Sequence, residues 1–196
     1  MSRRWLLGAA MVGAIAGMAA LPALASHTNQ TDPDDTRGIM DVAKVRFVHD
    51  DDSPKWTVVT YHGWRPGRLW DRGYVVVRLD TQGLPTSDYY VIVRSNRDRM
   101  VGTIYRDYAH ARDRLIGRVP VTRPDGRSVR VVIPLRFLTF GPARTSYWWS
   151  VLTLFTSGTC PQTCFDAVPD TGAVEQPLPS PSPTPSPTAT PIISSP

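Results

Sequence analysis

The fold is decided by the stretch Tyr74-Val75-Val76-Val77-Arg78-Leu79, in which side chains alternate between two faces. Val75, Val77 and Leu79 share one face, and the residues between them share the other. A period of two over β-branched and aromatic residues is typical of a strand that buries one face in a core. This stretch therefore predicts a β-strand.

The same alternation recurs along the chain, with turn residues between the repeats. We expect further strands at residues 42–48, 56–62, 89–94, 100–105, 115–121, 129–133 and 147–155. Pro124-Asp125-Gly126 and Ser95-Asn96-Arg97-Asp98 favour tight reversals between them. About eight short, regularly spaced strands predict an all-β fold, an antiparallel β-sandwich of the jelly-roll or immunoglobulin-like type. Residues 135–140 are compatible with a short helical turn.

Composition and charge exclude two classes of protein. Lys44 and Lys55 are the only lysines and Glu175 is the only glutamate, which argues against a helical domain. Without Arg3 and Arg4 the chain has 20 basic and 17 acidic residues, a formal charge of +3. Arginine and aspartate are interspersed between residues 94 and 114, so no basic stripe for nucleic acid is expected.

The first 25 residues have the pattern of an export signal. Arg3 and Arg4 precede an apolar run over residues 5–21, and Ala23-Leu24-Ala25 fits the small-x-small cleavage pattern. We expect cleavage before Ser26 and a secreted or envelope-associated protein with no membrane span after cleavage. A retained membrane anchor is the alternative, although the run is short and rich in alanine and glycine.

Three further segments are expected after the signal. Residues 26–37 are polar and acidic and predict a flexible N-terminal arm, and residues 38–172 contain the sandwich. Residues 173–196 are rich in proline, serine and threonine, which favours a disordered, extended tail.

Cys160 and Cys164 are the only cysteines, and both lie beyond the signal. In an exported domain we expect them to form a disulfide. Closure of so small a loop contributes about 2 kcal/mol at most, so the bond would hold a local loop and not the whole fold. Thiol redox chemistry and a metal site are the alternatives, but the spacing and the two thiols suit neither.

A ligand platform is predicted in the Gly/Pro-rich connection between two strands. Trp64 and Trp70 lie there, and indole faces stack on sugars or cations. Asp71 and Tyr108 are candidate additions to this ligand-binding set. The alternative is that both indoles cover the open end of the sandwich. Three other tryptophans lie in strand patterns that favour core packing: Trp56, Trp148 and Trp149.

Acidic residues crowd the start of the domain. Asp32, Asp34, Asp35 and Asp41 are candidate metal ligands, with calcium as the candidate ion because it prefers carboxylate and carbonyl oxygens. Their spacing departs from the known D-x-D-x-D-G calcium loop. Solvated turns are therefore the alternative, here and at the second cluster, residues 50–52.

No sequence motif assigns a catalytic residue. His62, with Asp71 and the aspartates of residues 50–52, is the best available acid/base set, but the spacing selects no reaction. Serine-hydrolase, zinc-protease and P-loop signatures are all missing from the sequence.

Four short segments resemble secreted bacterial β-sandwich modules of the broad DOMON and family-9 carbohydrate-binding type, and uncharacterised exported actinobacterial proteins. They are Asp35-Thr36-Arg37-Gly38-Ile39-Met40-Asp41-Val42, Val77-Arg78-Leu79-Asp80-Thr81, Val131-Val132-Ile133-Pro134-Leu135 and Tyr147-Trp148-Trp149-Ser150-Val151. The resemblance spans about residues 34–169. It implies a jelly roll that binds sugars or haem, in some members with calcium, although no Met/His pair for haem can be assigned.

These observations favour an exported, non-catalytic binding or surface-interaction module, with a glycan or cell-wall polymer as its partner. A secreted hydrolase that uses aspartate and histidine is one alternative. A structural envelope protein without a small ligand is the other.

Overall fold

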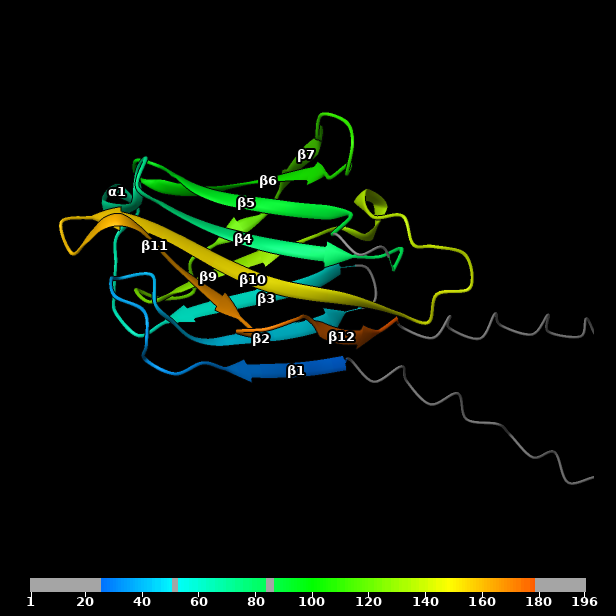
Figure 1. Cartoon of the computed structure of the whole chain (residues 1–196), viewed down its shortest axis with the longest axis horizontal. Coiled ribbons are helices and arrows are strands. Elements are labelled where there is room, and N and C mark those ends of the chain that lie inside the picture. Colours follow the sequence, from blue (N-terminus) through cyan, green and yellow to red (C-terminus); the bar gives the residue numbers. More distant parts are fainter. Residues whose placement is uncertain (1–25, 51–52, 84–86, 179–196) are drawn as a thin grey trace, which may run out of the picture. The chain divides into compact units, whose positions relative to one another are not determined.

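Antiparallel strands in two layers form the described chain (Figure 1). The computed structural model describes residues 26–50, 53–83 and 87–178. The strands of the first sheet lie in the order β1 (Ser26–Thr31), β2 (Val42–Asp50), β3 (Ser53–Thr60), β9 (Ser128–Val132) and β8 (Val121–Thr122).

The second sheet has more strands than the first, and its strand β10 pairs with three others, β4, β11 and β12. Its strands lie in the order β11 (Cys160–Val168), β10 (Ser146–Ser157), β4 (Gly73–Asp80), β5 (Tyr89–Asn96), β6 (Arg99–Arg106) and β7 (Arg114–Val119). A last strand, β12 (Val174–Pro177), pairs with the first residues of β10, beyond the end of β11. The all-β sandwich predicted from the sequence is confirmed.

Two short helical segments complete the described elements. Helix α1 (Pro66–Leu69) is a single turn between β3 and β4, and its Leu69 is fully buried. A 3₁₀ turn at Leu135–Phe137 follows β9, where the sequence allowed a short helical turn.

The core lies between the sheets and has an aromatic centre. Phe47 on β2 contacts Trp56 on β3, with ring centroids 5.0 Å apart, and Trp149 on β10 of the other sheet, at 5.8 Å. On β4, the alternating residues Val75, Val77 and Leu79 are all fully buried. The period of two is therefore the cause of the sandwich, because it gives each strand one apolar face that must be covered.

The predicted disulfide between Cys160 and Cys164 is present. Both cysteines lie on β11, next to its turn from β10, where Cys164 is opposite Phe155 and Cys160 is opposite Ser157. The bond thus closes the end of one hairpin within the second sheet.

The flexible arm predicted for residues 26–37 is wrong over its first half. Ser26–Thr31 forms β1 and pairs along its whole length with β2. Ladder pairing uses backbone groups, so an edge strand needs no apolar alternation, and the sequence pattern could not reveal it. The Thr28 hydroxyl also donates a hydrogen bond to Oε1 of Gln176 on β12, 3.0 Å away, and links the two sheets.

The sandwich also extends further toward the C-terminus than predicted, again because a strand that pairs through its backbone lacks an apolar alternation. Val174–Pro177 forms β12, although a disordered tail was predicted from residue 173. The signal at residues 1–25 and the tail from residue 179 lie outside the described residues and stay predictions. Among the described residues, no helix has both the length and the apolar character that a membrane crossing needs.

Candidate functional site

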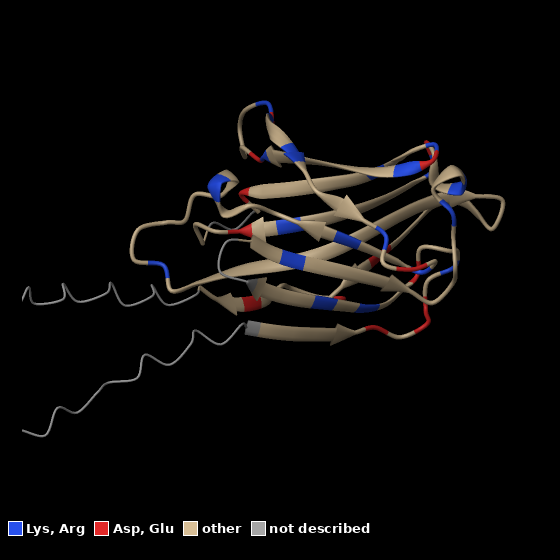
Figure 2. Cartoon of the chain, turned by 180° about the vertical axis from the view of Figure 1, so that it is seen from behind, with Lys and Arg blue, Asp and Glu red and all other residues tan. Residues whose placement is uncertain are grey.

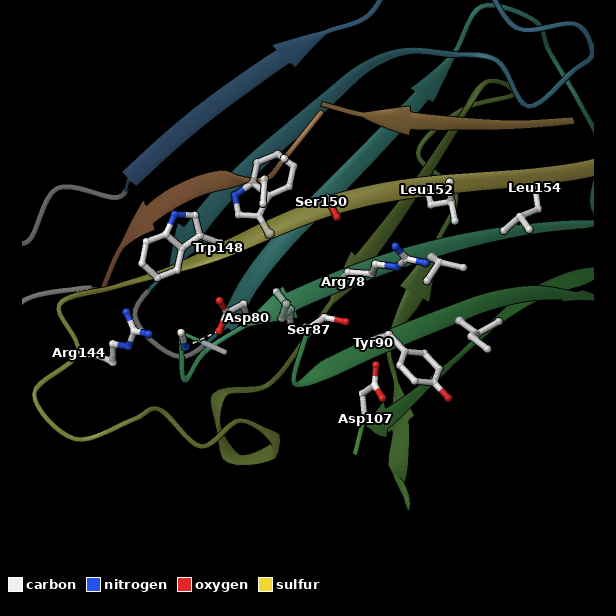
Figure 3. Close-up of a pocket in the computed structure, with 17 residues that line it drawn as sticks. Arg78, Asp80, Ser87, Tyr90, Asp107, Arg144, Trp148, Ser150, Leu152 and Leu154 are labelled. Carbon is white, nitrogen blue, oxygen red and sulfur yellow. Dashed lines mark hydrogen bonds between the residues drawn. The ribbon is translucent and has the colours of Figure 1, made fainter. Parts of the chain in front are cut away.

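The outer face of the second sheet is hollowed into an open groove of about 1070 Å³ (Figure 3). Strands β4, β5 and β10 form its floor, and connecting loops form its rim. The residues of the floor include Val76, Arg78, Asp80, Tyr90, Ile92, Trp148, Ser150 and Leu152. The side chains of the floor project from neighbouring strands into one space, as Figure 3 shows.

Strand register arranges the floor in rows. Arg78 lies between Ser150 on β10 and Tyr90 on β5, which makes a polar row. The next row consists of Leu152, Val76 and Ile92 and is apolar. The groove is therefore amphipathic, with flat apolar surface beside hydrogen-bonding groups.

Trp148 and Arg144 form a preorganised corner at the polar end. The Arg144 guanidinium carbon lies 5.1 Å from the centre of the Trp148 ring. The same guanidinium occupies the space that a Cβ atom at Gly83 would take, and Gly83 has a φ of +73°. Asp80 holds this turn, because its Oδ1 accepts hydrogen bonds from the backbone N–H groups of Gln82 and Gly83.

A pair of stacked tyrosines continues the polar row. The Tyr90 ring lies against Tyr105, with centroids 5.2 Å apart and an angle of 15° between the planes. The Tyr90 hydroxyl donates to Oδ2 of Asp113 at 2.6 Å. Burial, and then the hydrogen bond to Asp113, raise the pKa of Tyr90 above its usual value, so the phenol is neutral at physiological pH.

The structure does not bring Trp64 and Trp70 together as an exposed platform. Trp64 is only 5% exposed, its Nε1–H donates to Oγ1 of Thr60 at 3.0 Å, and the Arg123 guanidinium carbon lies 3.8 Å from its ring centre. The expectation that this loop presents Trp64 outward is wrong, and Trp64 instead covers the core. The fully buried Leu69 of α1 shows how firmly this connection packs on the end of the sandwich.

The other members of the predicted platform do not share the buried position of Trp64. Trp70 is 47% exposed, with the Arg97 guanidinium carbon 4.6 Å from its ring centre. Asp71 is exposed, and Tyr108 stacks under Arg106. None of these residues lines the groove.

The core position expected for Trp148 is also wrong. Trp148 is half-buried and lines the groove, whereas its neighbour Trp149 is in the core, as expected. The sequence held a signal for this, because adjacent residues of one strand must face opposite sides of the sheet. One of the two indoles had to lie outside the sandwich.

Three of the four predicted metal ligands lie in a second region, which we call the acidic pocket, whereas Asp34 is not among its clustered carboxylates. One carboxylate oxygen each from Asp32, Asp35 and Asp41 lies within 4.8 Å of the other two. Asp32 forms a second such group with Asp166 and Asp170, two residues that no sequence pattern singled out. These two lie 134 and 138 residues after Asp32 along the chain, so only the fold could reveal their proximity to it.

Burial and mutual repulsion perturb the carboxyls of the acidic pocket. Burial first, and then the charges of Asp166 and Asp170, raise the pKa of Asp32 to about 8. Burial and the neighbouring Asp34 carboxyl raise the pKa of Asp41 to about 7. The pKa of Asp166 is also raised, again mainly by burial.

The weak acid/base set is not assembled in the described part of the chain. His62 and Asp71 are both exposed, and no hydrogen bond joins the His62 ring to a carboxylate among the described residues. Residues 51–52 lie outside the described residues.

The fold and its groove define an antiparallel β-sandwich with a ligand-sized hollow on one outer face. No protein-family model, no curated protein and no solved structure matches the chain.

Proposed function

We propose that this protein is an exported, non-catalytic binding module that holds a carbohydrate chain in the groove across β4, β5 and β10. The observation that carries the proposal is the half-buried Trp148 beside two rows of the floor, one polar and one apolar. Sugars have apolar ring faces and equatorial hydroxyls, so they need both kinds of surface together.

The polar groups suit hydroxyl recognition. Arg78, Asp80 and Asp107 offer planar, charged groups that can form paired hydrogen bonds with adjacent hydroxyls. Arg144 stacks on one face of the Trp148 indole and restricts the orientation of the ring. A rigid aromatic side chain binds at lower entropic cost than a mobile one.

The groove also fits a chain better than a single small molecule. Its volume of about 1070 Å³ reaches the upper range for small-ligand sites, and it is open along the sheet surface. The disulfide and the signal pattern of residues 1–25 support export, where polysaccharides of cell walls are available as ligands.

Binding assays with defined polysaccharides test the proposal. The full chain, exported from its host, is incubated with peptidoglycan sacculi, cellulose and chitin, and soluble oligosaccharides of each are titrated by calorimetry. We expect binding to at least one, and we expect Trp148→Ala to weaken it about tenfold or more, because a buried aromatic anchor contributes at least about 1.4 kcal/mol.

Trp70→Ala is the matched control, since it removes an exposed indole outside the groove. It should bind as wild type does. Binding that survives in Trp148→Ala, or that is lost in Trp70→Ala, would place the ligand elsewhere. The absence of binding to all three polymers and their oligosaccharides would favour a structural envelope protein.

A further inference from the structure

The acidic pocket lies where three separate segments of the chain meet. Asp32 directly follows β1, Asp41 directly precedes β2, and Asp166 lies on β11 of the other sheet. Figure 2 shows acidic residues in the loop that leaves β1. The backbone N–H of Val42 donates to Oδ2 of Asp166 at 2.7 Å, which fixes the contact between β2 and β11.

The deepest carboxylates of this pocket have unsatisfied oxygens. Asp41 is 1% exposed, and neither of its carboxylate oxygens has a hydrogen-bond partner among the described residues. Asp32 is 6% exposed, and its Oδ2 is equally without a partner there. A buried carboxylate without a donor or a counter-charge is costly, so such groups are nearly always paired or bound to a cation.

Other carboxyls surround these oxygens. The charges that act most strongly on Asp32 are those of Asp166, Asp170 and Asp35. Ionised carboxylates accept hydrogen bonds and cannot donate them, so without a cation the cluster can satisfy its oxygens only by taking up protons. A multivalent cation is the alternative to these protons, and Asp32, which both groups share, would join them at the ion.

We propose that the acidic pocket binds Ca²⁺, with Asp32, Asp41 and Asp166 as inner ligands and Asp35 and Asp170 at the rim. Calcium lies 2.3–2.6 Å from its oxygen ligands, so oxygens on one ion are up to about 5 Å apart, in agreement with the 4.8 Å limit of both groups. Neither group contains histidine or cysteine, which zinc prefers. Magnesium demands a smaller, near-octahedral shell and keeps several waters.

Bound calcium would join the two sheets at one edge. It would tie the loop between β1 and β2 to β11 and to the turn that precedes β12. This inference does not depend on the proposed carbohydrate site, because no residue of the acidic pocket lines the groove.

Calcium titration of the chelator-treated full chain tests the proposal. We expect calorimetric binding with a Kd of about 1 mM or tighter and a rise of several degrees in Tm that EGTA reverses. Magnesium at the same concentration should give a clearly smaller rise.

Conservative variants separate a metal site from a merely structural cluster. Asp41→Asn and Asp166→Asn should weaken calcium binding at least about tenfold, since even outer-shell changes have such effects. In EGTA the same variants should have a Tm equal to or above that of wild type, because each removes one buried charge from a repulsive cluster. Asp71→Asn, at an exposed position, is the matched control and should change neither value.

Two outcomes would overturn the proposal. One is no calcium binding by the folded, disulfide-bonded protein at several times 1 mM. The other is an Asp41→Asn protein that keeps the calcium response but has a lower Tm in EGTA, because the buried carboxylates would then stabilise the fold without an ion.

Discussion

Gly83 is the residue on which the groove corner depends most. Its φ of +73° is strained for any residue with a Cβ atom, and such an atom would collide with the Arg144 guanidinium. We expect Gly83→Ala to lower the free energy of unfolding by about 1 kcal/mol or more and to displace Arg144 from Trp148. Chemical denaturation measures the first effect, and tryptophan fluorescence the second.

Alanine substitutions at two other glycines distinguish the effect of backbone strain from the effect of a steric clash. Gly172 has a φ of +76° but open space around its Cβ position, so Gly172→Ala should show the strain alone. Gly158 has open space as well and no positive φ, and Gly158→Ala should be nearly neutral. Equal losses for Gly83→Ala and Gly172→Ala would mean that contact with Arg144 is unimportant.

Trp64 and Trp70 should respond oppositely to truncation, although the sequence places them in one loop. Trp64→Ala removes a buried indole, its hydrogen bond to Thr60 and its stacking with Arg123, so a loss of about 3 kcal/mol or more is expected. Trp70→Ala at an exposed position should cost less than about 1 kcal/mol. Denaturant midpoints test the pair, and similar losses would contradict the burial difference.

At the scale of elements, sequence periodicity predicted the strands that bury one face. All eight expected strands correspond to observed ones, because alternation reports burial directly. The edge strands β1 and β12 were missed because they pair through their backbones without a clear apolar alternation, and β11 was missed because its alternation is weak and includes charged and polar residues. Two of the five residues of the acidic pocket, Asp166 and Asp170, were likewise hidden, since only tertiary structure brings them to Asp32.

The disulfide belongs to this scale, because it lies within one hairpin. Its loop is so short that its removal frees little entropy in the unfolded chain. We therefore expect Cys164→Ala to lower the free energy of unfolding by about 2 kcal/mol at most, with the strand content retained. Circular dichroism and urea unfolding of the variant check both parts, and a variant that fails to fold would show that the bond supports more than its hairpin.

The whole molecule connects its two candidate sites through one short turn. Asp170 belongs to the acidic pocket, and Gly172 and Ala173, only a few residues later, line the groove. An ion that fixes Asp170 would also order this rim of the groove. The two sites share no residue, and the backbone of this turn is a direct connection between them.

Calcium should therefore strengthen carbohydrate binding without contacting the ligand. We expect affinity for the proposed carbohydrate ligand to fall about fivefold when EGTA replaces calcium, at a temperature where circular dichroism shows the fold intact. Linkage requires the reverse effect, so saturating oligosaccharide should raise calcium affinity by the same factor, which calorimetry can measure. A positive coupling needs the turn to be ordered by the ion, so Asp170→Asn should reduce both effects together. Equal carbohydrate affinities with and without calcium would contradict the coupling and show that the groove is rigid on its own.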